Sequence, residues 1–170
     1  LVDYCDERSL PLWLVSEQRS RFNYHFNDRV PVVMAEIHTE IPERCDLHTM
    51  LQEPVVKAVM FLTAQEVREG PLSFMPHARS TQWFIHGQDI IPAEGGKLPA
   101  MRFMAEANGW TPDELMAFGD SENDNEMLRY AGTGVAMGNA LEETKAASDY
   151  VTDDCDDEGV AHALAHFALI

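Results

Sequence analysis

Basic residues are scarce in this sequence, and no apolar run is long enough to cross a lipid bilayer. Its 170 residues include 29 acidic and only 12 basic side chains, which gives a formal net charge of −17. Because an acidic surface repels nucleic-acid phosphates and anionic lipids, we expect binding to neither nucleic acid nor membrane. The longest apolar segment, residues 55–63, has the length of a strand, whereas a membrane-spanning helix needs about 20 apolar residues.

Cysteine and histidine form no recognisable metal or redox motif. The three cysteines, Cys5, Cys45 and Cys155, are far apart and odd in number, so we expect reduced thiols in a cytoplasmic protein. His162 and His166 share one face of an expected helix and could present two metal ligands. No acidic residue lies between them as in zinc proteases, so ordinary helix positions are the favoured interpretation.

The pattern of apolar residues changes where the run Ile-Pro-Ala-Glu-Gly-Gly occupies residues 91–96. Before this point, short alternating segments predict strands and a few short helices, as in an α+β domain over residues 1–92. We expect strands over residues 12–15, 21–24, 55–63, 81–86 and 89–91, a hairpin turn at Gly87-Gln88, and helices over residues 30–37, 47–51 and 64–69.

After residue 96, helices and strands alternate regularly. The apolar run at residues 115–118 is typical of a parallel strand that is buried on both faces. We expect further strands over residues 133–137 and 150–151, and helices over residues 97–108, 123–131, 141–147 and 158–168, the last capped by Asp156 or Asp157. This alternation predicts an α/β fold, a parallel sheet covered by helices, over residues 93–170.

The segment Gly-Asp-Ser-Glu-Asn-Asp at residues 119–124 carries the strongest chemical signal. Asp120 follows an expected parallel strand, and ligands collect beyond the carboxyl ends of such strands. Asp124 lies four residues on, in the first turn of the next expected helix, which places two carboxylates close together. Paired carboxylates with water and a substrate phosphate are the usual ligands of magnesium. The alternative is that these acids only cap the helix.

The neighbours of this segment resemble one enzyme family. Residues 127–128 are Met-Leu, 131–132 are Ala-Gly, 134–140 are Gly-Val-Ala-Met-Gly-Asn-Ala and 149–151 are Asp-Tyr-Val. From residue 96 to the C-terminus these motifs resemble the Cof-type branch of the haloacid dehalogenase (HAD) superfamily. The resemblance implies a partial HAD-like, Rossmann-like parallel sheet core with an α+β cap domain. Residues 1–92, which match only in the order of their elements, would be the N-terminally incomplete cap, and residues 93–170 the C-terminal half of the core.

The resemblance also implies roles for single residues. Lys97 lies 120 − 97 = 23 residues before Asp120, matches the motif lysine of the superfamily, and would bind the transferring phosphoryl group. Asp120 would bind Mg²⁺ directly or through water, while Asp124 and Asn123 would hold the metal shell or form hydrogen bonds within the site, and Asn123 would also contact phosphate. Asn139, after the next expected strand, would line the phosphate pocket or simply form a turn.

The superfamily's nucleophile segment, Asp-x-Asp-x-Thr, has no counterpart in the sequence. Asp-Cys-Asp at residues 154–156 has the acid spacing, but Asp157 and Glu158 follow it, and it comes after Lys97 and Asp120 rather than before them. We therefore expect a fragment that lacks the nucleophile and is inactive alone. A parallel sheet without its central strand would expose open edges, so self-association is also expected.

These expectations support one principal hypothesis and two alternatives. The parent protein would be a phosphatase that hydrolyses phosphate monoesters of small metabolites with Mg²⁺, through an aspartyl-phosphate. In the first alternative, the chain is a catalytically dead, truncated interaction module that keeps a metal site. In the second, the same active site transfers phosphoryl groups between metabolites, as a phosphomutase does.

Overall fold

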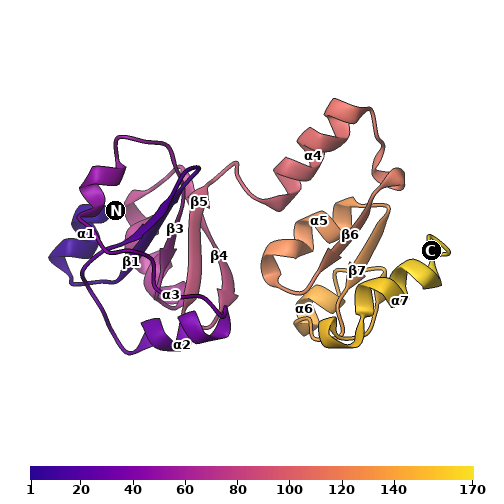
Figure 1. The fold of residues 1–170 in the computed structure, drawn as a ribbon. Coiled ribbons are helices and arrows are strands. Elements are labelled where there is room, and N and C mark those ends of the chain that lie inside the picture. Colours follow the sequence, from indigo (N-terminus) through magenta and orange to yellow (C-terminus); the bar gives the residue numbers. More distant parts are fainter. The chain divides into compact units, whose positions relative to one another are not determined.

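The computed structural model describes all 170 residues, and they form two compact units, Leu1–Glu94 (unit 1) and Gly95–Ile170 (unit 2). Figure 1 shows the helices and strands of each unit. The expected boundary between residues 92 and 93 lies two residues before the observed one. None of the helices combines the length and hydropathy that a membrane-spanning segment requires.

Unit 1 is built on a five-stranded antiparallel sheet with the strand order β2-β1-β3-β5-β4. The strands are β1 (Leu12–Ser16), β2 (Ser20–Phe22), β3 (Val55–Met60), β4 (Ala78–Phe84) and β5 (Gly87–Pro92). The helices are α1 (Val2–Glu7), α2 (Arg29–Glu36) and α3 (Ala64–Glu69), with the 3-10 helices η1 (Leu47–Met50) and η2 (Pro71–Phe74). The expected strands and helices occur in the predicted order, whereas α1 and η2 were not predicted.

Each face of this sheet buries its own apolar cluster. On one face, Leu14 and Ile90 pack with residues of α1, η1 and α3. On the other face, α2 packs Val30 and Val33 over Val59 and its neighbours. Side chains alternate between the faces of a strand, so successive residues of β3 enter different clusters. Two covered faces explain why this small unit keeps a core of its own.

The hairpin between β4 and β5 turns earlier than the sequence predicts. Gly87 is not a turn residue but the first residue of β5, paired with Phe84, so that Ile85 and His86 form the turn. The glycine serves close packing instead, because a Cβ at Gly87 would lie 2.8 Å from ring atoms of Trp83. The prediction was wrong because a glycine required for packing looks the same in sequence as a glycine required for a turn.

A residue of the capping box of α3 also binds a side chain of α2. Thr63 and Glu66 cap the first turn of α3 reciprocally, and Arg29 of α2 donates two hydrogen bonds to Glu66, at 2.7 and 3.1 Å. The hydrogen bonds from Arg29, and then those from Thr63, lower the pKa of Glu66 to about 2. The carboxylate of Glu66 therefore caps the start of α3 and also connects α3 to α2, which lies on the other face of the sheet.

Unit 2 contains a parallel sheet with the order β6-β7-β8, which confirms the predicted α/β class. The strands are β6 (Met116–Gly119), β7 (Thr133–Ala136) and β8 (Tyr150–Val151). The helices are α4 (Lys97–Asn108), α5 (Asn125–Tyr130), α6 (Glu142–Lys145) and α7 (Gly159–His166), with the 3-10 helices η3 (Pro112–Glu114), η4 (Glu122–Asp124) and η5 (Cys155–Asp157).

Two details of unit 2 differ from the prediction. Strand β6 is not buried on both faces: Ala117 is buried while Phe118 is half-buried, because one small cluster of apolar side chains covers only one face. Neither Asp156 nor Asp157 caps α7. Asp154 instead accepts a hydrogen bond from the amide of Asp156 at 3.2 Å and caps η5, since a turn forms there before the helix begins.

His48 connects α1 to η1 through two carboxylates. Its Nε2 lies 2.8 Å from Oδ1 of Asp3, and its Nδ1 lies 2.9 Å from Oδ1 of Asp46. The hydrogen bond with Asp3, and then the one with Asp46, raise the pKa of His48 above its usual 6.5. The protonated ring can donate to both carboxylates at once, which the neutral ring cannot do.

We predict that His48 makes stability depend on pH. Because its pKa is raised in the folded state, its contribution is fully present below about pH 6.5 and is lost as the pH rises through the folded value. The difference in unfolding free energy between the wild type and His48→Asn, measured by urea titration, should therefore shrink from pH 5.5 to 8.5. His77→Asn, which removes an exposed histidine, is the control. A difference that grows with pH would contradict the prediction.

Candidate active site

The carboxylate of Asp124 is the centre of a polar site within unit 2. It is 1% exposed, and both of its oxygens accept hydrogen bonds. Nζ of Lys97 lies 2.5 Å from Oδ1, while the backbone amides of Asp120 and Ser121 donate to Oδ2 at 3.1 and 3.3 Å. The structure thus brings together three of the residues singled out from sequence, from two elements that are distant along the chain.

The end of β6 and the turn after it hold Asp124 in place. Ser121 and Asp124 form a capping box around η4, so the aspartate lies on the 3-10 turn before α5 rather than inside the expected helix. A Cβ at Gly119 would lie 2.4 Å from the Cβ of Asp124. Only glycine lets the carboxylate pack this closely against the end of the strand, where it reaches the amides of the turn.

Lys97 is the first residue of α4, and its side chain is 48% exposed. One of its three N–H groups is used by Asp124, which leaves two for other acceptors. The buried carboxylate therefore fixes the position of an ammonium group that remains accessible to solvent. Such a group can bind an anion, phosphate included.

Asp120 differs from Asp124 in having a free carboxylate. Its backbone carbonyl accepts a hydrogen bond from Leu141 at 3.1 Å, but its exposed side chain makes no hydrogen bond or ion pair. Asn123 lies close by in sequence, and its Oδ1 is buried without a partner. A buried acceptor without a donor is costly, and the cost is removed when the oxygen binds a cation or water.

These two oxygen groups fit a small, hard cation such as Mg²⁺. A free carboxylate on Asp120 and an unpartnered amide oxygen on Asn123 are ligands that Mg²⁺ accepts, with water filling other positions. Asp124 fits less well than the sequence suggests, because direct metal binding would compete with its bond to Lys97. The hydrogen bonds of Asp124 instead hold the side chain of Lys97 and the turn after β6 in position.

Asn139 lies in the loop after β7, which runs beside the end of β6. The amide of Met137 donates to the carbonyl of Gly119 at 2.9 Å. The Oδ1 of Asn139 accepts from the amide of Cys155 at 3.3 Å. Of the two roles left open by the sequence, the loop contact is observed, while the side-chain amide of this exposed residue is still able to donate to a ligand.

Two further buried polar groups were not singled out from the sequence. Asn125, the first residue of α5, and Thr144, in α6, have side-chain oxygens that are buried and unpartnered. Helix α6 lies against η4, so both belong to the surroundings of the Asp124 turn. No pattern marks them, because burial without a partner is a property of the folded state.

The remaining metal-ligand candidates are less convincing. Potential ligand atoms of Asp154, Cys155 and Asp156 lie within 4.8 Å of one another, but this loop is exposed and acidic, and such groups are common without a metal. His162 pairs with Asp153 at 2.8 Å, and the ring of His166 stacks on Tyr150 with centroids 4.3 Å apart. The two histidines therefore do not converge on one point.

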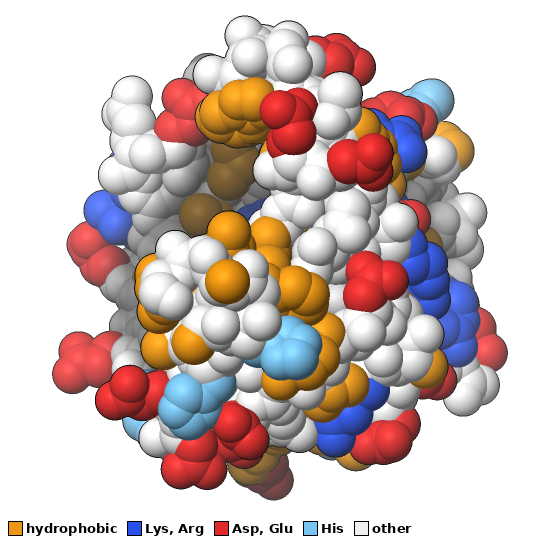
Figure 2. Space-filling view, turned by 90° about the vertical axis from the view of Figure 1, so that its right-hand side faces the viewer, with side chains coloured by type: hydrophobic (Ala, Val, Ile, Leu, Met, Phe, Trp, Pro, Cys, Tyr) orange, Lys and Arg blue, Asp and Glu red, His pale blue; other side chains and the backbone are white.

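Acidic side chains are common on the protein surface. On the face of the molecule shown in Figure 2, they lie among apolar and other residues.

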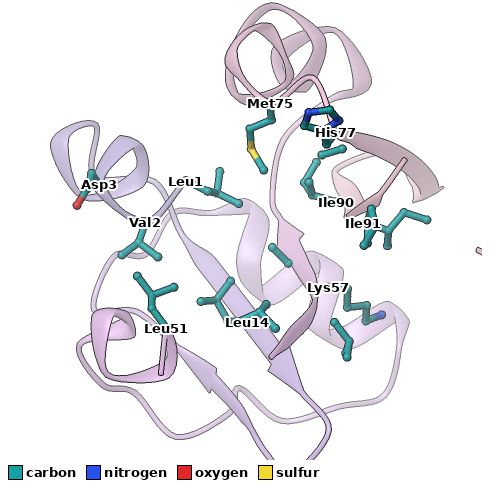
Figure 3. Close-up of a pocket in the computed structure, with 15 residues that line it drawn as sticks. Leu1, Val2, Asp3, Leu14, Leu51, Lys57, Met75, His77, Ile90 and Ile91 are labelled. Atoms are coloured by element: carbon teal, nitrogen blue, oxygen red, sulfur yellow. The ribbon is translucent and has the colours of Figure 1, made fainter. Parts of the chain in front are cut away.

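A cavity of about 360 Å³ lies in unit 1, next to α1, β1, β3 and β5. Most of its walls are aliphatic, as the side chains of Leu14 and Met75 show in Figure 3. The charged side chains of Asp3 and Lys57 lie on different sides of it (Figure 3), and each is already paired with a neighbour. The cavity therefore offers no free charge to a phosphate ester.

Comparisons with known proteins identify the family of this chain. A family model described as haloacid dehalogenase-like hydrolase matches residues 1–164. YkrA of Bacillus subtilis (strain 168), which is named as a candidate phosphatase, is 29% identical over 170 residues, covering 100% of this chain and 65% of YkrA. A phosphoglycolate phosphatase of Methanothermobacter thermautotrophicus is 33% identical over 152 residues, covering 84% of this chain and 67% of that protein.

Solved structures show the same relationship. The HAD subclass IIB sugar phosphatase BT4131 superimposes with a TM-score of 0.86 at 29% identity, covering 99% of this chain and 65% of that one. A protein from a study of a phosphoryl-transfer superfamily superimposes with a TM-score of 0.89 at 29% identity, covering 99% and 64%. The chain thus spans about two thirds of the length of YkrA and of these structures. With its α/β fold and a family match over residues 1–164, this chain belongs to the haloacid dehalogenase-like hydrolase family.

Proposed function

We propose that this chain carries the phosphate-binding and magnesium-binding part of the active site of a phosphatase. The observation that carries the proposal is the contact between the ammonium of Lys97 and the buried carboxylate of Asp124, 2.5 Å apart, next to the free carboxylate of Asp120. A fixed ammonium group at the start of α4 and a free carboxylate on the turn after β6 suit a phosphate ester and its metal ion. The names of the relatives support a small phosphorylated metabolite as substrate.

In this proposal each residue has a separate task. Lys97 donates its two free N–H groups to oxygens of the phosphoryl group, where negative charge increases in the transition state. Asp124 holds the ammonium in place, and Asp120 with Asn123 supplies oxygen ligands for Mg²⁺. A bound Mg²⁺ would neutralise phosphate charge and orient the ester. Asn139 is proposed to donate its amide to a phosphate oxygen.

The carboxylate that attacks phosphorus has no candidate in the 170 residues. The proposed reaction, hydrolysis through an aspartyl-phosphate, therefore needs a nucleophile beyond those identified here. We propose that unit 2 is the C-terminal half of a HAD core and that unit 1 is its cap. A cytoplasmic location is proposed from the three free cysteines, Cys5, Cys45 and Cys155.

A non-catalytic, metal-binding module is the second candidate function. It is favoured by one observation, that binding groups are present without an Asp-x-Asp-x-Thr segment. Strand β6 is also at the edge of its sheet, and an open edge can pair with a second copy. Turnover by the protein at its natural length separates the two candidates.

We predict that Asp120→Asn and Asp124→Asn have different effects. Asp120→Asn should weaken Mg²⁺ binding, measured by calorimetry on the 170-residue chain, and should change the unfolding free energy by less than about 0.5 kcal/mol, as exposed substitutions do. Asp124→Asn should lower the unfolding free energy by about 1–3 kcal/mol, because the charged partner of Lys97 is lost. Equal effects of both variants on both measurements would contradict these assignments.

Lys97→Met is predicted to weaken phosphate recognition more than it weakens Mg²⁺ binding. In the protein at its natural length, kcat/KM for p-nitrophenyl phosphate should fall by about 100-fold or more, as when one donor to a transition-state oxyanion is removed. Lys145→Met is a matched control, since this lysine pairs with Glu142 on an exposed helix. A loss of less than tenfold in Lys97→Met would argue against its role.

The 170-residue chain alone is predicted to bind Mg²⁺ without turning over p-nitrophenyl phosphate. The reason is that the proposed binding groups are present while an attacking carboxylate has not been found. Release of p-nitrophenol is measured with Mg²⁺ and with chelator. Turnover that depends on Mg²⁺ and disappears in Asp120→Asn would show that the chain holds a nucleophile after all.

A further inference from the structure

Two buried side chains of unit 2 carry oxygen atoms that no protein group satisfies. Thr144, in α6, is 0% exposed, and Asn125, the first residue of α5, is 9% exposed. Oγ1 of Thr144 and Oδ1 of Asn125 are both buried and have no hydrogen-bond partner within the protein. A buried polar atom without a partner is destabilising, so both oxygens call for a partner that is not part of the chain.

The helices that carry these two residues lie on the same face of the parallel sheet. The chain passes from β6 through α5 to β7, and then through α6 to β8, while the strand order is β6-β7-β8. Both connections therefore lead in one direction across the sheet. Connections between parallel strands are right-handed in nearly all proteins, and two right-handed connections in one direction place their helices on one face. Both α5 and α6 accordingly contact β7.

Within these helices, both side chains belong to one buried region. Leu128, one turn after Asn125, packs against Ala117 of β6. Residues three apart share a helix face, so Asn125 also faces the sheet. Thr144 is the buried residue of α6, and α6 lies against η4, which ends at Asn125. The two oxygens therefore lie on the covered sides of neighbouring elements.

The chemistry of the two oxygens matches a water molecule. The amide oxygen of Asn125 accepts hydrogen bonds, and the hydroxyl of Thr144 both donates and accepts. Water can serve both groups at once, and internal waters usually bind polar groups that the protein leaves unsatisfied. Neither side chain carries a charge that would offset the dehydration of an ion, so the pair favours water over a cation or an anion.

The same region supports the turn that carries the proposed metal ligand. The amide of Leu141, the N-cap residue of α6, donates to the carbonyl of Asp120 at 3.1 Å. Asn125 follows directly after Asp124, where the turn ends. Helix α6 is thus attached to the start of the turn through Leu141, and a water between Asn125 and Thr144 attaches it to the end of the turn as well.

We propose that Asn125 and Thr144 hold one internal water molecule that connects α6 to the end of the turn from Asp120 to Asp124. The two are positioning residues, because they act on the metal site only through the turn. The positioning role rests on the proposed binding of Mg²⁺ by Asp120, whereas the shared water does not depend on it.

A double-mutant cycle in the protein at its natural length tests the shared water. Asn125→Leu and Thr144→Val each remove one ligand of the water and leave the other oxygen unsatisfied, so each should lower Tm. The double variant replaces both polar groups with apolar groups of similar size. Its Tm should therefore be no lower than that of either single variant.

Asn108→Leu combined with Thr144→Val is the control pair, because Asn108 donates to the carbonyl of Met104 in its own helix at 2.8 Å. The Tm shifts of this pair should add. Additive losses in the Asn125 and Thr144 pair overturn the shared water.

Calorimetry with Mg²⁺ tests the positioning role. Thr144→Val should weaken Mg²⁺ binding about tenfold, as the loss of a group that supports a metal ligand does. Thr144→Ser keeps the hydroxyl and should bind Mg²⁺ as the wild type does, although the loss of a buried methyl group lowers its Tm. Equal Mg²⁺ affinity in these two variants overturns the positioning role. If the wild type does not bind Mg²⁺, the proposed metal site fails, and the Tm cycle still decides on the shared water.

Discussion

The buried carboxylate of Asp124 is the group on which the candidate active site depends. A charge that is 1% exposed is tolerable only when donors satisfy it, and here Lys97 and the amides of Asp120 and Ser121 do so. These contacts fix the turn after β6. In this turn, the side chain of Asp120 is exposed to solvent. Gly119 makes the arrangement sterically allowed. One desolvated carboxylate thus positions both the ammonium group proposed to bind phosphate and the carboxylate proposed to bind a metal ion.

The two units carry different kinds of chemistry. Unit 2 combines an ammonium group with free oxygen ligands, which suits a phosphate and a divalent cation. In unit 1, the charges of Lys57 and Asp89 instead pair with each other. Membership of the haloacid dehalogenase-like hydrolase family agrees with the chemistry proposed for unit 2.

Sequence reasoning was most reliable where local physics decides the structure. The strand–helix alternation of unit 2 and the strands of unit 1 were predicted correctly, since period and turn residues encode them. The predictions were wrong where tertiary packing decides the structure. Gly87 allows close contact with Trp83 and is not a turn residue. Asp154 caps the 3-10 helix η5, whereas Asp156 or Asp157 had been expected to cap α7. Lys97 and Asp124 were both selected from the sequence, but their direct contact was not. The two residues are 27 positions apart, and this separation does not predict the distance between their side chains in the folded protein.

By itself, the sequence determined the α/β class of unit 2, the family resemblance and the group of residues from which the site is built, because these depend on residue order and periodicity. Only the tertiary structure decided which acid is buried and which is free. It also decided that Asn123, Asn125 and Thr144 have unpartnered oxygens, and that Lys57, Trp83 and Asp89 share a sheet face. Burial and hydrogen-bond satisfaction depend on neighbours that are remote along the chain, so no local pattern can specify them.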